Sequence, residues 1–244
     1  MNSAPTKEST PAELLIATIA RLVESCRHVA VGAASPIPAA GALLARERSG
    51  GRMRVSILGS ERNSQMTNGG VELFDLAAQG RMDAFFLGGG QIDGRGNLNL
   101  VGTGEYPKNK VRWPGSFGSA YLYFLVPRVI LFREEHSRRV LVPRVDFISA
   151  PGVSAPGVHR PGGPHALLTR MALFFFDRER PGFRLASVHP GHSLEEVRDN
   201  TGFDFDCPQS VPATAAPDRA SLALVRGAVR NEVAEAYPRF AALN

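Results

Sequence analysis

The chain has 244 residues, of which 43% are hydrophobic and 21% are charged, and this composition is typical of a globular protein with a sizeable core. The formal net charge is +5, but only three of the 28 basic residues are Lys, and the basic residues form no long stripe. We therefore expect no nucleic-acid partner. A solvated Arg-rich surface is the favoured explanation for the charge, and a site for the phosphates of an anionic ligand is the alternative.

The two cysteines, Cys26 and Cys207, lack the spacing of a metal motif or of a disulfide framework. The histidines show no HExxH or HxxxH spacing, so we expect no metal site. No apolar run approaches the roughly 20 residues that span a bilayer, and the N-terminus lacks the apolar core of a signal peptide. The sequence predicts a cytoplasmic protein that does not contact a membrane.

The first predicted element is a helix that begins after Thr10. Thr10 and Glu13 have the spacing of a capping box, and Pro11 lies at the first helical position, where its missing N–H costs nothing. Apolar residues then recur at helical spacing as far as about Cys26.

Short apolar strands and helices alternate through the rest of the chain. The expected strands are residues 28–32, 55–58, 83–87, 128–132, 145–148 and 185–189, with a further apolar run at 167–176. The expected helices are residues 39–46, 71–79, 193–200 and 217–236. This order predicts an α/β fold, an open and mostly parallel sheet with helices on both faces. Since no long linker divides the chain, we expect a flexible N-terminus over residues 1–10 and a single domain over residues 11–244.

The segment from residue 88 to residue 119 holds nine glycines in 32 positions and follows a buried strand, where open α/β sheets place their ligand crevices. Closely spaced glycines let backbone N–H groups approach a ligand or a developing oxyanion. Asp93, Asn97 and Asn99 can anchor such a loop by side-chain hydrogen bonds to the backbone. From the residues alone, a ligand-binding loop and a loop that only turns both remain open.

This segment resembles the β-subunit signature of the family I CoA-transferases. That family shows Gly-Gly-Ala-Gln-x-Asp, then Gly-Asn-x-Asn, and later a Pro-Gly-Ser-Gly-Gly-like loop. The chain has GGGQID at 88–93, GNLN at 96–99 and PGSFGS at 114–119. Further similarity lies at Val31-Gly32 with Pro36, at 146–152 and at 200–205, in family order across roughly residues 12 to 230.

The resemblance implies an open α/β fold, an α-subunit partner and an active site at their shared interface. It implies a CoA thioester as substrate and no permanently bound cofactor. It also implies a mechanism in which a glutamate attacks the acyl-CoA to form an anhydride and then an enzyme-bound CoA thioester, which passes CoA to an acceptor carboxylate. A carboxylate becomes a better nucleophile when it is desolvated and held against the thioester carbon, and backbone amides of a glycine loop stabilise the oxyanion.

The residues that the resemblance assigns fall into two groups. The oxyanion loop corresponds to Gly115 through Gly118, with Phe117 where the family often has glycine. The expected residues for binding substrate and CoA are Gly89, Gly90, Gln91, Asp93, Asn97, Asn99, Arg112 and Ser116. For Arg112, a contact to the CoA phosphates or acyl group and simple loop packing remain open.

The catalytic glutamate is the main departure from the family pattern. The family places it directly after the second core strand, in a Glu-Ser-Gly or Glu-Asn-Gly triplet. Here the strand is followed by Gly59-Ser60-Glu61, so the simplest register places Gly59 at the nucleophile position. A local shift of two residues would bring Glu61 into the site, and Glu61 is the candidate nucleophile.

Two other functions remain open. Relatives of this fold without the glutamate hydrolyse a carbon–carbon bond in a cyclic acyl-CoA, as α/β heteromers of bacterial steroid breakdown. A non-catalytic subunit that stabilises an active α-subunit is the third hypothesis.

A Rossmann dehydrogenase is disfavoured, because no GxGxxG follows the first strand. An aromatic or bulky apolar acyl pocket is a further hypothesis, made from composition, with Phe74, Phe85, Phe86, Phe117 and Tyr121 as its residues.

Overall fold

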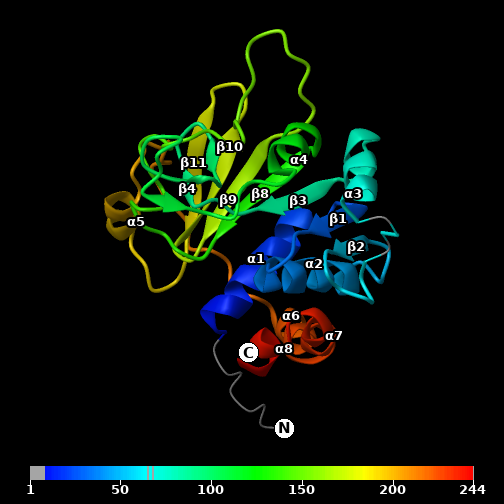
Figure 1. The fold of residues 1–244 in the computed structure, drawn as a ribbon. Coiled ribbons are helices and arrows are strands. Elements are labelled where there is room, and N and C mark those ends of the chain that lie inside the picture. Colours follow the sequence, from blue (N-terminus) through cyan, green and yellow to red (C-terminus); the bar gives the residue numbers. More distant parts are fainter. Residues whose placement is uncertain (1–8, 65, 68, 244) are drawn as a thin grey trace. The chain divides into compact units, whose positions relative to one another are not determined.

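A computed structural model describes residues 9–64, 66–67 and 69–243 (Figure 1). The chain divides into two compact units, one formed by residues 1–67 with 215–244 and the other by residues 68–214. The single domain expected over residues 11–244 stays a prediction. The flexible segment expected at residues 1–10 lies mostly outside the described residues. Among the residues that the structure describes, no helix is long and apolar enough to cross a membrane.

The first unit starts with two helix–strand repeats. Its elements are α1 (Pro11–Val23), β1 (His28–Val31), α2 (Pro36–Arg48) and β2 (Arg54–Ile57), and the two strands pair in parallel. The predicted capping box is present, since the Thr10 amide donates to Glu13 Oε2 at 2.8 Å and the Glu13 amide donates to Thr10 Oγ1 at 3.2 Å. A Cβ on Gly41 would lie 2.4 Å from the Ile19 side chain, so glycine lets α1 and α2 pack closely.

The second helix begins at Pro36, three residues earlier than predicted. Sequence analysis predicted a helix over residues 39–46, without the two prolines before it. Proline is tolerated in the first helical turn, however, where the backbone N–H groups have no partner within the helix. Proline inside a helix usually breaks it, but at residue 36 it begins one, and the prediction therefore started the helix too late.

The C-terminal part of the first unit is a run of short helices: α6 (Arg219–Leu224), the π-helical turn η1 (Val225–Val229), α7 (Arg230–Ala236) and α8 (Pro238–Leu243). Sequence analysis predicted one helix over residues 217–236, and the π-helical turn in its middle was not foreseen. Arg226 forms a bidentate ion pair with Glu13 of α1, at 2.6 and 2.9 Å. Arg46 of α2 pairs with Glu232 of α7. These ion pairs join the C-terminal helices to the N-terminal ones.

The second unit is built on five strands in the order β11-β10-β9-β8-β3. The strands are β3 (Ala84–Leu87), β8 (Arg128–Arg133), β9 (Pro164–Thr169), β10 (Ala172–Asp177) and β11 (Gly182–Val188), and the helices are α3 (Gly69–Ala78), α4 (Ser119–Leu125) and α5 (Leu194–Asn200). The β3–β8 and β8–β9 pairs are parallel, and β10 pairs antiparallel with both β9 and β11. With the parallel pair of the first unit, this confirms the predicted α/β fold with a mostly parallel sheet.

Two details of the second unit differ from prediction. The apolar run at residues 167–176 is not one element but parts of β9 and β10, joined by a tight turn. The strand predicted at residues 145–148 is wrong, because this segment is an irregular loop. The backbone of this loop bonds to side chains instead of to a neighbouring strand. The Asp146 amide, for example, donates to Gln91 Oε1 at 2.9 Å.

The glycine-rich segment between β3 and α4 forms two small ribbons of its own. β4 (Gln91–Ile92) pairs with β5 (Leu98–Asn99), and β6 (Gly102–Thr103) pairs with β7 (Val111–Arg112), both antiparallel. The segment is therefore an ordered extension of the carboxyl end of β3.

Candidate active site

The Asp93 carboxylate organises the first of these ribbons. Asp93 is buried, and its oxygens accept hydrogen bonds from the Arg95 amide at 3.0 Å, the Asn97 amide at 3.1 Å and the Asn97 Nδ2 at 3.0 Å. Asn97 Oδ1 in turn accepts from the Gly152 amide at 3.1 Å. These bonds connect three of the motifs on which the family resemblance rests, at residues 88–93, 96–99 and 146–152.

A second polar centre lies at Asn99, whose side chain is fully buried. Its Nδ2 donates to Gln91 Oε1 at 2.8 Å and to the Gly102 carbonyl at 2.7 Å. Its Oδ1 accepts from the amides of Val101 and Gly102, at 3.0 and 3.3 Å. Gln91, Asp93, Asn97 and Asn99 thus use their polar atoms inside the protein, as buried polar groups must. Their direct contact with substrate stays a prediction.

Gly89 and Gly90 allow close packing. A Cβ on Gly90 would lie 2.3 Å from the ring of Trp113, and one on Gly89 would lie 2.8 Å from the Gln91 carbonyl oxygen. Neither glycine has a positive φ. Trp113 follows β7 directly, so the indole ring ties the second ribbon to the start of the glycine-rich segment.

The loop from Gly115 to Gly118 has the properties that an oxyanion site needs. Within the part of the chain that the structure describes, no protein acceptor bonds the four amides of residues 115–118. Gly115 has a φ of 110°, which disfavours side chains, and no atom lies within 4 Å of an ideal Cβ there. The loop closes with the Ser119 amide donating to the Ser116 carbonyl at 2.8 Å. Consecutive free amides in an exposed glycine loop can donate to a developing negative charge.

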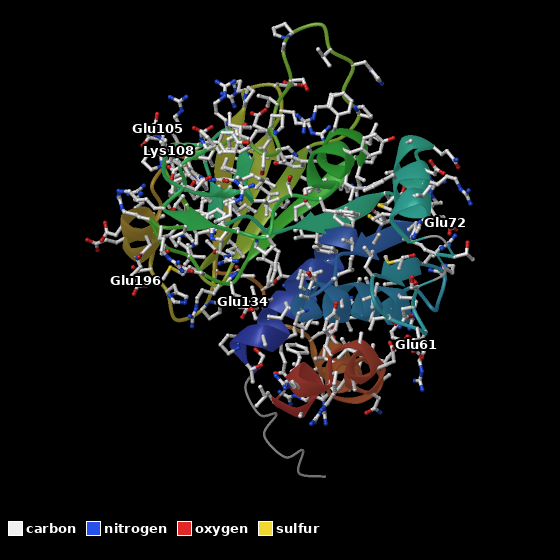
Figure 2. All side chains as sticks on the ribbon, viewed as in Figure 1. Glu61, Glu72, Glu105, Lys108, Glu134 and Glu196 are labelled. Carbon is white, nitrogen blue, oxygen red and sulfur yellow. The ribbon has the colours of Figure 1, made fainter. Side chains whose placement is uncertain are left out.

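The turn that carries Glu61 lies in the first unit, directly after β2. Glu61 is exposed (Figure 2), and Gly59 has a φ of 90° with open space around it. The turn is held by Glu235 of α7, whose carboxylate accepts from the Ser60 hydroxyl at 2.5 Å and from the Glu61 amide at 2.8 Å. These two donors, the hydroxyl first, lower the pKa of Glu235. The Glu235 carboxylate therefore fixes the backbone of the turn while leaving the Glu61 carboxylate in solvent.

Glu235 is the residue of this turn that sequence reasoning missed. It lies 175 residues from Ser60 in a helix whose pattern gave no reason to single out one glutamate. Only the packing of α7 brings it to the turn.

Arg112 lies exposed on β7, in the same ribbon as two exposed lysines, Lys108 and Lys110. Among the described residues Arg112 makes no ion pair, and its one side-chain hydrogen bond, to Asn109, is long at 3.4 Å. Figure 2 shows Lys108 at the surface. Residues 102–112 of this ribbon hold one acidic residue, Glu105, and three basic ones, so their net charge is +2.

A buried histidine network lies elsewhere in the second unit. Thr201 Oγ1 donates to the Val197 carbonyl at 2.7 Å, so it accepts from Nε2 of His136 at 3.0 Å. Nδ1 of His136 lies 2.7 Å from Thr169 Oγ1, whose hydroxyl donates to the Ala172 carbonyl at 3.2 Å. Burial lowers the pKa of His136 to about 4, so the ring is neutral at pH 7. Among the described residues no group of three potential ligands could hold a metal ion.

The His136 pKa leads to a prediction for stability. The unfolded chain binds a proton at His136 below about pH 6.5, whereas the folded chain does so only near pH 4. Stability from this group is therefore complete above pH 6.5 and is lost as the pH falls towards 4. Between pH 7.5 and pH 5 we expect His136 to account for a loss of about 2 kcal/mol in the free energy of unfolding. Urea denaturation at both pH values measures it.

His136→Gln should remove most of this pH dependence, because glutamine does not titrate. His159→Gln is the matched control, since His159 is exposed, and it should keep the dependence of the wild type. Equal pH dependence in wild type and His136→Gln would show that other groups cause the acid loss.

Comparison with known proteins places the chain in a family. The model of the coenzyme A transferase family matches residues 10–200. The β subunit of glutaconate CoA-transferase from Acidaminococcus fermentans is 34% identical over 148 residues, which cover 58% of this chain and 54% of the relative. The crystal structure of that transferase has a TM-score of 0.78 at 25% identity, covering 90% of this chain and 94% of the other.

Two further relatives carry out other reactions according to their names. The cholesterol ring-cleaving hydrolase IpdB subunit of Rhodococcus jostii is 27% identical over 159 residues, which cover 64% of this chain and 62% of the relative. The structure of the decarboxylase AibA/AibB has a TM-score of 0.76 at 26% identity, covering 89% of this chain and 93% of the other. The chain matches between half and two thirds of the length of the curated relatives. Since the family model spans most of the sequence, the chain belongs to the coenzyme A transferase family.

Proposed function

We propose that this chain is the β subunit of a hetero-oligomeric enzyme that moves CoA between an acyl-CoA and a carboxylic acid. The observation that carries the proposal is the loop from Gly115 to Gly118, whose amides have no protein acceptor among the described residues. The loop stands in the family's motif order, in a chain matched by the family model over residues 10–200.

In the proposed reaction the Glu61 carboxylate attacks the thioester carbonyl, and CoA leaves as a thiolate from an acyl-glutamyl anhydride. The thiolate then attacks the glutamyl carbonyl, which releases the first carboxylic acid and leaves CoA bonded to Glu61 as a thioester. The acceptor carboxylate attacks that thioester, and the thiolate returns to the acyl carbonyl of the new anhydride. The products are a new acyl-CoA and a free Glu61. Each attack creates an oxyanion that amides of the 115–118 loop can stabilise.

The binding roles divide between the surface and the interior of the glycine-rich segment. We propose that Arg112, with Lys108 of the same ribbon, binds phosphates of CoA, because the guanidinium group is exposed and has no ion-pair partner among the described residues. Ser116 lies in the loop of free amides, close to where the thioester would sit. Gly89, Gly90 and the buried polar residues described above act by holding these groups in position.

An α-subunit is the proposed partner, because relatives with this fold were solved as the pairs AibA/AibB and IpdAB. The CoA thioester is a substrate, and no permanently bound cofactor is proposed. The cytoplasm is the proposed location, since both cysteines are free thiols and reducing compartments keep them so. A catabolic role is proposed from the family resemblance alone.

The alternative function is that of a β subunit in a ring-opening hydrolase that acts on a CoA thioester. Two observations favour it. In the simplest register of the family resemblance Gly59 stands at the position of the nucleophile, and the chain is 27% identical to a ring-cleaving hydrolase subunit. In this alternative water is the co-substrate and no acceptor acid is needed.

Reconstitution with the α-subunit tests the proposal. We expect the isolated chain to be inactive and the co-purified α/β complex to convert an acyl-CoA and a labelled carboxylic acid into labelled acyl-CoA. Mass spectrometry of the CoA products measures the transfer. Full activity in the isolated chain would contradict the heteromer, and turnover that is independent of the acceptor acid would favour the hydrolase.

A further inference from the structure

Three aromatic side chains form a cluster beside the 115–118 loop, and we call Phe74, Phe117 and Tyr121 the aromatic shelf. The ring of Phe74 lies 5.6 Å from that of Phe117 and 5.5 Å from that of Tyr121. Phe117 is 84% exposed and Tyr121 is 46% exposed. Val71, on the same helix as Phe74, is 58% exposed and extends the apolar surface. Contiguous exposed apolar side chains, unlike scattered ones, are typical of binding surfaces.

Phe117 is held in a strained conformation to join this shelf. Its φ of 42° lies in the left-handed region, which costs a residue with a Cβ roughly 1–2 kcal/mol. Strain combined with exposure gives the folded chain no evident benefit, because the ring gains little burial in return. Such outliers concentrate at functional sites. Phe117 also belongs to the loop of free amides, so its ring projects from the backbone that we propose holds the thioester oxygen.

Two glycines make room for the shelf. A Cβ on Gly118 would lie 2.1 Å from the Phe74 ring, and one on Gly70 would lie 3.1 Å from the tip of Phe117. Side chains at these positions would push the rings away. The glycine at 118 therefore supports the placement of Phe74 as well as the loop.

The aromatic shelf has no charged side chain, and this bears on whether its ligand is charged or apolar. The shelf residues carry no charge, and the charged residues of α3, Glu72 and Asp75, are both acidic. Figure 2 shows Glu72 on α3. A carboxylate on the bound group would lose water against the rings without gaining an opposite charge from them. A hydrocarbon group would gain by burying the exposed rings.

We propose that the aromatic shelf binds the acyl part of the CoA thioester, and that this acyl part is bulky, apolar and without a second carboxylate. The inference rests on the proposed function, because it takes the 115–118 amides as the site of the thioester oxygen. An acyl chain attached to a carbonyl carbon at those amides lies beside Phe117, which is the reason for choosing the acyl group over a protein surface as the occupant.

The test uses the α/β complex and compares cyclohexanecarboxyl-CoA, glutaryl-CoA and acetyl-CoA. We expect the wild type to prefer the cyclohexane thioester over the other two in kcat/KM. Phe117→Gly, which introduces the residue that the family often has, should lower the ratio of kcat/KM for cyclohexanecarboxyl-CoA to that for acetyl-CoA by tenfold to about a hundredfold. Val158→Ala, an exposed apolar residue outside the shelf, is the control and should leave this ratio unchanged.

Three outcomes would overturn the inference. One is an unchanged ratio in Phe117→Gly, and another is a wild-type preference for glutaryl-CoA. The third is loss of the α-subunit from Phe117→Gly on size-exclusion chromatography, which would assign the shelf to the subunit interface.

Binding measurements separate this inference from the proposed function. Calorimetry gives the affinity of the complex for each thioester without turnover. If no transfer occurs but cyclohexanecarboxyl-CoA binds more tightly than glutaryl-CoA, and Phe117→Gly removes the difference, the shelf stands while the transferase proposal fails. If transfer occurs with equal affinities in both proteins, the shelf fails alone.

Discussion

Replacing Glu61 by Gln in the α/β complex is expected to lower kcat for CoA transfer by at least about 10³-fold. The amide has the size of the carboxylate but is not a nucleophile, so neither the anhydride nor the enzyme-bound CoA thioester can form. Folding should be unaffected. The Glu61 side chain is exposed, and the hydrogen bond to Glu235 comes from its backbone amide, which Gln keeps.

Trapping with hydroxylamine measures this directly. The wild type should be inactivated by hydroxylamine only after acyl-CoA is added, and intact mass should place the modification on this chain. Glu61→Gln should show neither effect. Glu134→Gln is the matched control, because Glu134 is also exposed but lies in the second unit, and it should behave as the wild type does.

Retained activity in Glu61→Gln would show that this chain supplies no nucleophile and would favour the hydrolase. Gly59→Glu then tests whether a glutamate at the position expected from the family could still act as the nucleophile. The space around Gly59 is open, but its φ of 90° strains any side chain by roughly 1–2 kcal/mol. A gain of hydroxylamine-sensitive activity in the double variant Gly59→Glu, Glu61→Gln would show that the family register is still usable in this turn.

Much of the fold could be predicted because its signals are local. Thr10 and Glu13 are three residues apart, so a capping box is visible in the sequence, and it is present in the structure. The buried strand β3 follows from a run of apolar residues. The π-helical turn at 225–229 could not be predicted, because it interrupts a helical pattern without a proline. The loop at 145–148 could not be predicted either, since its apolar letters resemble a strand and its hydrogen-bond partner, Gln91, is distant in sequence.

The candidate site divides in the same way. The glycine loop at residues 115–118 was singled out by its motif, and its amides have no protein acceptor among the described residues, while its role as an oxyanion site stays a prediction. Trp113 over Gly90 and Glu235 at the Glu61 turn depend on tertiary packing, which no spacing in the sequence reveals. Motifs thus located the segments, but which side chains face a ligand and which face the interior depends on partners elsewhere in the chain.

Asp93 is the candidate site residue whose interior hydrogen bonds should contribute most to stability. We expect Asp93→Ala to lower the free energy of unfolding by about 3 kcal/mol, because it leaves the Arg95 amide, the Asn97 amide and the Asn97 side chain without their acceptor inside the protein. For a chain of this size that corresponds to a fall in Tm of about 6–12 °C. Urea denaturation and thermal scanning of the purified chain measure the change.

Asp146→Ala is the control for Asp93→Ala, because Asp146 is exposed and its carboxylate accepts one backbone hydrogen bond, from Gly104 at 2.7 Å. Asp146→Ala should lower the free energy of unfolding by only about 1 kcal/mol. The comparison also decides the role of Asp93. If Asp93 only holds the ribbon together, Asp93→Ala lowers the free energy of unfolding, and any rise in KM for acyl-CoA is a consequence of the loosened ribbon. If Asp93→Ala instead keeps the wild-type stability and raises KM, the carboxylate contacts the substrate, and the ribbon must open to expose it.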